Sequence, residues 1–156
     1  MIKINVPGYR EFEFKYIVLD YNGTLAVDGE LLPGVKDRLN ELAEDVEVHI
    51  LTADTFGKVR SRMEGVRCSV SVLPPGDQDT GKLRYVQNLG TDHTVCIGNG
   101  RNDRPMLKEA ALGIAVILAE GCATETLVSA DVVFTDILSA LELLQNPLRL
   151  AATLRK

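Results

Sequence analysis

The chain contains no tryptophan, and aromatic residues make up only 5% of its 156 residues. So few rings argue against a surface on which nucleic-acid bases stack. The formal net charge of -5 also provides no basic surface for a phosphate backbone. Nucleic-acid binding is therefore not expected.

Long hydrophobic runs and a disulfide framework are missing as well. No apolar run reaches the roughly 18–20 residues that cross a bilayer, and residues 1–5 alternate apolar and polar side chains instead of forming a signal-peptide core. The three cysteines, an odd number at scattered positions, favour a reducing compartment. We expect a cytoplasmic protein without a membrane partner.

Short β-branched apolar runs recur between stretches of helical periodicity. Continuous runs of this kind are typical of strands buried on both faces of a parallel sheet. They span residues 16–20, 46–52, 68–73, 94–98, 113–118 and 131–134. Strands that alternate with helices predict an α/β fold with a doubly wound, mostly parallel sheet.

The stretches between these runs predict five helices. They cover residues 35–43, residues 55–64 with Asp54 as cap, residues 82–89 after Thr80-Gly81, a segment that begins at Asp103, and residues 137–144. Pro105 is tolerated in the first turn of its helix. The leucine-rich segment 137–144 is expected to pack as an amphipathic helix.

Two hairpins are expected beside this core. Residues 1–15 alternate on either side of a Pro-Gly turn and predict a leading hairpin. Residues 25–32 surround Asp28-Gly29, a pair that two-residue turns favour, and predict a flap-like hairpin. Without a linker, repeat or large insertion, residues 1–156 are expected to form a single domain with no large cap.

Polar side chains follow three of the expected strands. Asp20 ends the first core strand, Thr52 ends the second, and Asp103 follows the strand at 94–98. Lys82 lies at the expected start of the preceding helix. Because ligands of doubly wound sheets bind beyond the carboxyl ends of the strands, these residues predict a phosphate and metal site.

Each residue type suits a step of phosphoryl transfer. Asp20 can attack phosphorus and form an acyl phosphate, and backbone N–H groups in the turn after it can hold phosphate oxygens. Thr52 can donate to the phosphoryl group, and Lys82 can offset negative charge. Asp103 and Asp20 can supply carboxylates to Mg²⁺, which also binds phosphate.

These residues resemble the motifs of the haloacid dehalogenase superfamily of phosphohydrolases. The segment Asp20-Tyr21-Asn22-Gly23-Thr24 resembles its Asp-x-Asp-Gly-Thr motif, and residues 98–103 resemble its Gly-Asp-Gly-x-Asn-Asp motif. Thr52 and Lys82 occupy the positions of the superfamily's Ser/Thr and Lys motifs in this resemblance. The likeness covers roughly residues 15–137 and is strongest to the phosphorylation domain of P-type ATPases, which has Thr-Gly-Asp at the position of Thr52-Ala53-Asp54.

The resemblance implies a Mg²⁺-dependent phosphohydrolase or phosphotransferase that acts through an aspartyl-phosphate on Asp20. It also implies a shared set of site residues. The catalytic residues are Asp20, Asn22, Thr52 and Lys82; the phosphate-binding residues are Tyr21, Asn22, Gly23, Thr52, Ala53 and Lys82; the metal ligands are Asp20, Asn22, Asn99 and Asp103. The Tyr21 side chain is expected to help shape the entrance.

Two substitutions and one short segment depart from the superfamily's pattern. Asn22 replaces the Asp that serves as general acid and base, and Asn99 replaces an acidic metal contact. Residues 25–47 are too few for the nucleotide-binding domain of a P-type ATPase, and this excludes ion pumping.

Low or selective activity on an activated phosphate donor is therefore the main hypothesis. A non-catalytic phosphate or nucleotide sensor is the alternative. A receiver-type phospho-acceptor domain fits less well, because the candidate nucleophile ends the first core strand. The expected substrate is a phosphorylated small molecule or macromolecule, and with no cap over the site we expect a homo-oligomer or a macromolecular substrate.

Overall fold

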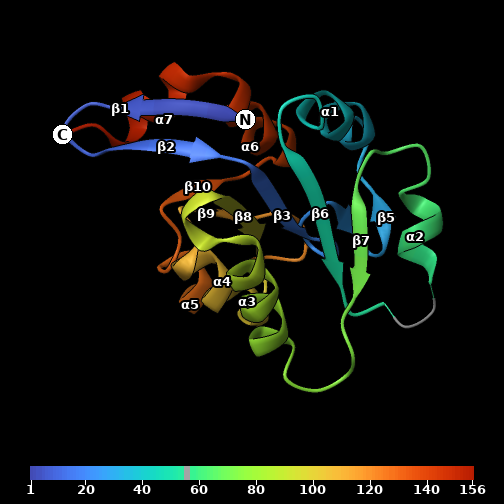
Figure 1. Cartoon of the computed structure of the whole chain (residues 1–156). Coiled ribbons are helices and arrows are strands. Elements are labelled where there is room, and N and C mark those ends of the chain that lie inside the picture. The colour runs from blue at the N-terminus through green and yellow to red at the C-terminus, as the bar shows by residue number, and fades with distance from the viewer. Residues whose placement is uncertain (55–56) are drawn as a thin grey trace.

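The computed structural model describes residues 1–54 and 57–156, and its centre is a six-stranded parallel sheet. The strand order is β10-β9-β8-β3-β6-β7 (Figure 1). The strands are β3 (Tyr16–Asp20), β6 (Glu47–Thr52), β7 (Ser69–Val72), β8 (Thr94–Gly98), β9 (Leu112–Val116) and β10 (Val132–Phe134). The expected doubly wound sheet is confirmed, with strand ends one or two residues from their predicted positions at most.

Helices cover both faces of this sheet because its strands are apolar on both sides. In β3, Ile17 and Leu19 pack into one hydrophobic cluster and Val18 into the other. The helices α1 (Val35–Leu42), α2 (Lys58–Arg62) and α6 (Ile137–Glu142) contribute to the first cluster, and α3 (Gln78–Leu89), α4 (Arg104–Glu109) and α5 (Thr124–Leu127) to the second. None of the helices in the described ranges is long and apolar enough to cross a membrane.

The leading hairpin extends the first cluster. Its strands β1 (Ile2–Val6) and β2 (Arg10–Phe14) are antiparallel, and every second side chain toward their ends is buried. Helix α7 (Pro147–Leu154), which the sequence analysis did not anticipate, lies against β1 (Figure 1). The two ends of the chain therefore form one layer beside the sheet.

The second hairpin directly follows β3. It joins β4 (Ala26–Val27) to β5 (Glu30–Leu31) through Asp28 and Gly29, whose φ angles are 52° and 79°. Two positive φ angles are what a type I′ turn requires. The Tyr21 hydroxyl donates a hydrogen bond of 3.1 Å to the Gly29 carbonyl. The expectation that Tyr21 shapes the entrance is wrong, because its side chain is buried and supports this hairpin.

Two helices begin elsewhere than expected. Helix α3 starts at Gln78, and the Gly81 N–H donates to the Asp77 carbonyl at 3.0 Å. The helix continues through Gly81 because a glycine lowers helix stability by only about 1 kcal/mol relative to alanine. Lys82 therefore lies in its second turn. Helix α2 starts at Lys58, and residues 55–56 of its expected start lie outside the described residues. The Asp54 carboxylate does accept a bond from the Val59 N–H at 2.9 Å.

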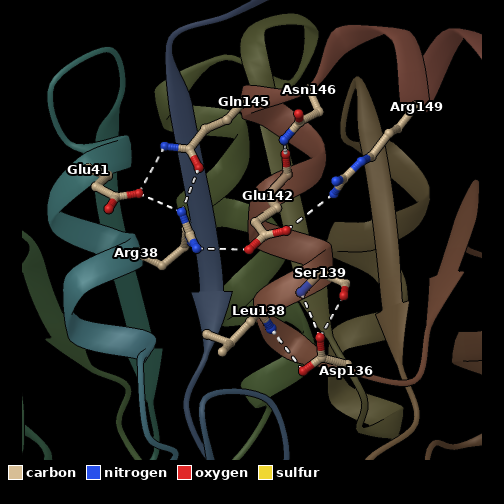
Figure 2. A network of polar contacts seen from close by, with 9 residues as sticks. All are labelled: Arg38, Glu41, Asp136, Leu138, Ser139, Glu142, Gln145, Asn146 and Arg149. Carbon is tan, nitrogen blue, oxygen red and sulfur yellow. Dashed lines mark hydrogen bonds and ion pairs between the residues drawn. The ribbon is translucent and has the colours of Figure 1, made fainter.

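Arg38 connects α1 to the C-terminal helices (Figure 2). Its guanidinium donates to Glu41 at 2.6 Å, to Glu142 at 2.8 Å and to Gln145 at 3.3 Å. Asp136 caps α6 by accepting from Ser139 N at 2.9 Å. The expected helix at 137–144 is thus α6 followed by the 3-10 turn η3 (Leu143–Gln145).

We expect Arg38→Ala to lower the free energy of unfolding by about 1–2 kcal/mol, because it removes hydrogen bonds to two helices and leaves Glu142 with one fewer partner. Urea denaturation followed by circular dichroism measures this change. Arg149→Ala is the control: it also removes a contact with Glu142, at 3.2 Å, but the arginine is exposed, so we expect about 0.5 kcal/mol or less. Equal losses in the two variants would show that Arg38 does not hold the helices together.

Candidate active site

A buried lysine lies between two aspartates at the carboxyl end of the sheet. The Lys82 ammonium is 2.7 Å from Asp20 Oδ1 and 2.6 Å from Asp103 Oδ1. It also donates to Asn102 Oδ1 at 3.2 Å. The Lys82 side chain is only 2% exposed, so its charge depends on these partners rather than on water. The structure thus brings together three residues predicted from separate parts of the sequence.

The strand order explains why these groups meet. β3 lies between β8 and β6, so the chain departs in opposite directions on its two sides. Ligands of open α/β sheets bind at such a switch point. Asp20 ends β3, and Asp103 follows β8 in the 3-10 turn η2 (Arg101–Asp103). Thr52 ends β6, where its Oγ1 accepts from the Asp54 N–H at 3.1 Å and keeps its own proton free to donate.

Burial and charge shift the titration of this cluster. Burial, together with repulsion from Asp103, raises the pKa of Asp20 to about 7 despite the attraction of Lys82. Burial alone would lower the pKa of Lys82, but Asp20 and Asp103 together raise it above its ordinary value. The ammonium therefore stays charged. The pKa of Asp20 lies close to neutral pH, so a small change in its surroundings is enough to ionise the carboxyl group.

Asn99 joins two loops of the site. Its Oδ1 accepts from the Thr24 hydroxyl at 3.2 Å, and its Nδ2 donates to the Gly121 carbonyl at 3.0 Å. The same Thr24 hydroxyl lies 3.3 Å from Asp20 Oδ2. Gly23 has a φ of +79°, and a Cβ there would lie 2.3 Å from Asn99 Nδ2. Only glycine fits at this position, since the Asn99 amide fills the space.

Asp103 is fixed by the turn that precedes it. Its Oδ2 accepts from the backbone N–H groups of Asn99, at 3.0 Å, and Gly100, at 2.8 Å. A Cβ on Gly98 would lie 2.5 Å from Asp103 Cγ, so the glycine permits this close approach. Asp103 precedes α4, but its carboxylate accepts from this turn and from Lys82 and makes no side-chain cap bond to the helix.

A cavity of about 260 Å³ opens above these residues. Its lining residues are Asp20, Asn22, Ala53, Gln78, Lys82, Asn99, Gly100, Asn102 and Glu120. Five of them were predicted from the sequence. Thr52 and Asp103 were predicted too, and both are buried residues that do not line the cavity.

Sequence reasoning missed the other contributors. Asn102 and Thr24 belong to the recognised motifs, so the sequence signal was present but no role was assigned. Gln78 opens α3, and Glu120 lies in the loop after β9, with no pattern that marks either. The Glu120 carboxylate accepts from the Asp28 N–H at 3.2 Å, which connects this loop to the flap-like hairpin.

The donor set suits a magnesium ion that is bound together with phosphate. Among the described residues, no group of three or more His, Cys, Asp or Glu side chains could hold a metal. Asp20, Asp103 and the Asn99 amide oxygen offer oxygen ligands, and each aspartate oxygen that contacts Lys82 has a second lone pair. Mg²⁺ typically uses one or two carboxylates, several waters and substrate phosphate. The residues therefore fit Mg²⁺ as one part of a ternary site.

No family model matches the chain. Among curated proteins it is 43% identical over 84 residues to the uncharacterized protein MJ0073 of Methanocaldococcus jannaschii, a match that covers 51% of this chain and 90% of that protein. The chain belongs to the MJ0073 family. That relative has no assigned activity in its name, so the site of the present chain is the basis for its function.

Solved structures identify the fold. A 3-deoxy-D-manno-octulosonate 8-phosphate phosphatase from Moraxella catarrhalis, in complex with magnesium, phosphate and KDO, is 21% identical with a TM-score of 0.66 over 86% of this chain and 87% of its own. The cobalt-bound enzyme of that name from Haemophilus influenzae is 15% identical with a TM-score of 0.70, over 92% and 94%. A haloacid dehalogenase-like hydrolase from Bacteroides thetaiotaomicron is 13% identical with a TM-score of 0.63, over 83% and 99%.

The expected haloacid dehalogenase fold without a large cap is therefore confirmed. The closer likeness to the phosphorylation domain of P-type ATPases stays a prediction.

We expect Asp20→Asn to stabilise the metal-free protein at pH 8 by about 1–3 kcal/mol, because it removes a buried carboxylate whose pKa is raised to about 7. The pKa is higher in the folded than in the unfolded chain, so ionisation disfavours the folded state increasingly as pH rises toward 7. The gain should shrink as pH falls from 7 toward 4. Thermal unfolding in EDTA at several pH values measures it.

Asp92→Asn, at an exposed position, is the matched control and should change stability by about 0.5 kcal/mol or less at any pH. Lys82 keeps Asp103 as a partner in Asp20→Asn, so no buried charge is left alone. A loss of stability at pH 8 in Asp20→Asn would show that the Asp20–Lys82 pair outweighs the burial of the carboxylate.

Proposed function

We propose that the protein is a Mg²⁺-dependent phosphohydrolase that forms an aspartyl-phosphate on Asp20. The observation that carries this proposal is the buried Lys82 held between Asp20 and Asp103, with Asp20 facing the cavity. The fold supports it too, since a solved phosphatase of this fold was found with magnesium and phosphate.

In the first step, a carboxylate oxygen of Asp20 attacks phosphorus. The bond between phosphorus and the leaving oxygen breaks, and its electron pair departs with the leaving group. Lys82 keeps positive charge beside Asp20, and the Thr52 hydroxyl and the backbone N–H groups of Asn22 and Ala53 hold the phosphoryl oxygens. The Gly23 N–H, expected to bind phosphate, instead donates to the Ala26 carbonyl at 2.8 Å. Asp20, Asp103 and the side-chain oxygens of Asn22 or Asn99 would hold Mg²⁺, which would supply further charge neutralisation.

In the second step, water attacks the phosphorus and restores the Asp20 carboxylate. Asn22 lines the cavity, but an amide cannot take up the proton of that water. A missing general base typically costs about 10²–10⁴ in rate. The intermediate therefore forms faster than it breaks down, and donors whose leaving group needs no protonation are favoured.

Two further parts of the proposal concern the surroundings of the site. The cavity has no large cap, so we propose that a second copy of the chain or a macromolecular substrate covers it in the cytoplasm. The persistence of an aspartyl-phosphate is also what the likeness to the P-type ATPase phosphorylation domain implies. A phosphate or nucleotide sensor that keeps the site without turnover is the competing interpretation.

Incubation with Mg²⁺ and acetyl phosphate should produce a hydroxylamine-sensitive phosphoprotein, and Asp20→Asn should abolish it. Asn22→Asp should raise the breakdown rate of the intermediate about 10- to 1,000-fold, because it restores a proton acceptor. Intact-mass spectrometry over time measures both. If acetyl phosphate, an aryl phosphate and ATP all fail to label the wild-type protein, the sensor interpretation is favoured instead.

Asn99→Asp should strengthen Mg²⁺ binding in the absence of phosphate, because it adds a carboxylate beside Asp20 and Asp103. It should also lower the stability of the metal-free protein by about 1–3 kcal/mol, since the donor to the Gly121 carbonyl is lost. In the wild type, Mg²⁺ and phosphate should each bind weakly alone and tightly together. Calorimetric titration with and without phosphate measures these affinities.

Asn88→Asp makes the same charge change on the exposed side of α3 and serves as control. It should leave the calorimetric affinity for Mg²⁺ unchanged. Equal Mg²⁺ affinity of the wild-type protein with and without phosphate would contradict the charge argument.

A further inference from the structure

A second and larger cavity adjoins the candidate active site. It measures about 430 Å³ and is lined by Gly76, Asp77, Gln78, Asp79, Arg101, Asn102, Arg104, Pro105 and Glu125. Gln78 and Asn102 line both cavities, and Asn102 Nδ2 donates to Gln78 Oε1 at 3.1 Å. Asn102 also accepts from Lys82. This bonded pair of amide side chains therefore separates the two cavities, and a group attached to a phosphate on Asp20 would have to pass only this pair to enter the second one.

Two arginines bring positive charge to this cavity. Arg101 Nε lies 3.5 Å and Arg104 Nη1 lies 3.4 Å from the same carboxylate oxygen of Glu125. The three side chains are 81%, 47% and 52% exposed, so these long ion pairs contribute little to stability. Both guanidinium groups thus approach the same carboxylate. An anionic ligand can take the place of the Glu125 carboxylate with little loss of stability, because these ion pairs are weak.

The site chemistry points to the same ligand class independently. Asn22 cannot protonate a leaving oxygen, so an alkoxide leaving group is disfavoured. A phosphate or diphosphate leaves as a stable anion and needs no proton. We infer that the substrate is a phosphoanhydride, with its terminal phosphoryl group at Asp20 and its phosphate or diphosphate leaving group bound by Arg101 and Arg104. This inference rests on the proposed function and adds the substrate class to it.

The step balances without an added acid. Asp20 forms the new bond to the terminal phosphorus, the bridging P–O bond breaks, and the bridging oxygen keeps the electron pair on the departing anion. Water later breaks the bond between phosphorus and the Asp20 oxygen, and its proton remains on the released inorganic phosphate. The arginines offset the charge that grows on the bridging oxygen during the first step.

The acidic residues of the cavity limit the length of the anion. Asp77 and Asp79 belong to the start of α3, whereas Arg101 belongs to η2 and Arg104 begins α4. Asp79 is already engaged, because its carboxylate accepts from the Thr80 N–H at 2.7 Å. Their negative charge disfavours a long polyphosphate across the whole cavity and favours a leaving group of one or two phosphates beside the arginines.

The test compares how fast different donors phosphorylate Asp20. The donors are pyrophosphate, tripolyphosphate and p-nitrophenyl phosphate, which has an aryl leaving group without a second anion. Single-turnover labelling with Mg²⁺ is measured for the wild type, Arg101→Ala/Arg104→Ala, Glu125→Gln and the control Arg84→Ala, an exposed arginine on α3 outside the cavity lining. The readout is the ratio of the labelling efficiency with a phosphoanhydride to that with the aryl phosphate.

We expect this ratio to fall at least tenfold in the double arginine variant, to rise about two- to fivefold in Glu125→Gln, and to stay constant in Arg84→Ala, in keeping with charge-assisted contacts. A ratio that is the same in the wild type and the double variant overturns the inference. So does labelling by p-nitrophenyl phosphate without labelling by either phosphoanhydride, and the proposed function then still stands. No labelling by any donor overturns both.

Discussion

The contact on which the site depends is the buried Lys82 ammonium between Asp20 and Asp103. A lysine that is 2% exposed is tolerated because carboxylates compensate its charge, and Asp20 and Asp103 both approach it within 2.7 Å. This requirement fixes the second turn of α3 against the ends of β3 and β8. When Asp20 is ionised, the two carboxylates exceed the ammonium by one negative charge, and this excess suits the proposed binding of Mg²⁺ together with phosphate.

Much of the fold could be predicted because the strands are buried on both faces. Continuous apolar runs such as residues 16–20 and 94–98 are typical of strands that are buried on both faces at the centre of a parallel sheet. Helix α7 was missed although Pro147 stands in its first turn, and its contact with β1, at the other end of the chain, has no local signal. Gly81 misled the prediction for α3, because local rules treat a glycine as a boundary while the helix continues through it.

The site was predictable where strand ends and motifs coincide. Asp20 and Thr52 end their strands and Asp103 follows one. A parallel sheet brings the carboxyl ends of its strands to one edge, and this does not depend on the conformation of the loops. Gln78 and Glu120 reach the cavity only through the three-dimensional course of their loops. The burial of Lys82 depends on a contact with a residue 62 positions away, which no local pattern encodes. Arg101 lies inside a recognised motif, but the second cavity that it lines has no sequence signature.

The flap-like hairpin is attached to the residue next to Asp20, the proposed nucleophile. Tyr21 is buried, bonds to the hairpin turn through its hydroxyl and shares a peptide bond with Asp20. The hairpin tip also contacts the Glu120 loop. The Leu25 and Ala26 N–H groups also donate to the Tyr21 carbonyl, at 2.9 and 3.1 Å, so side chain and backbone both join the hairpin to the neighbour of Asp20. A partner bound to residues 26–31 would therefore contact a segment that is hydrogen-bonded to the residue beside Asp20.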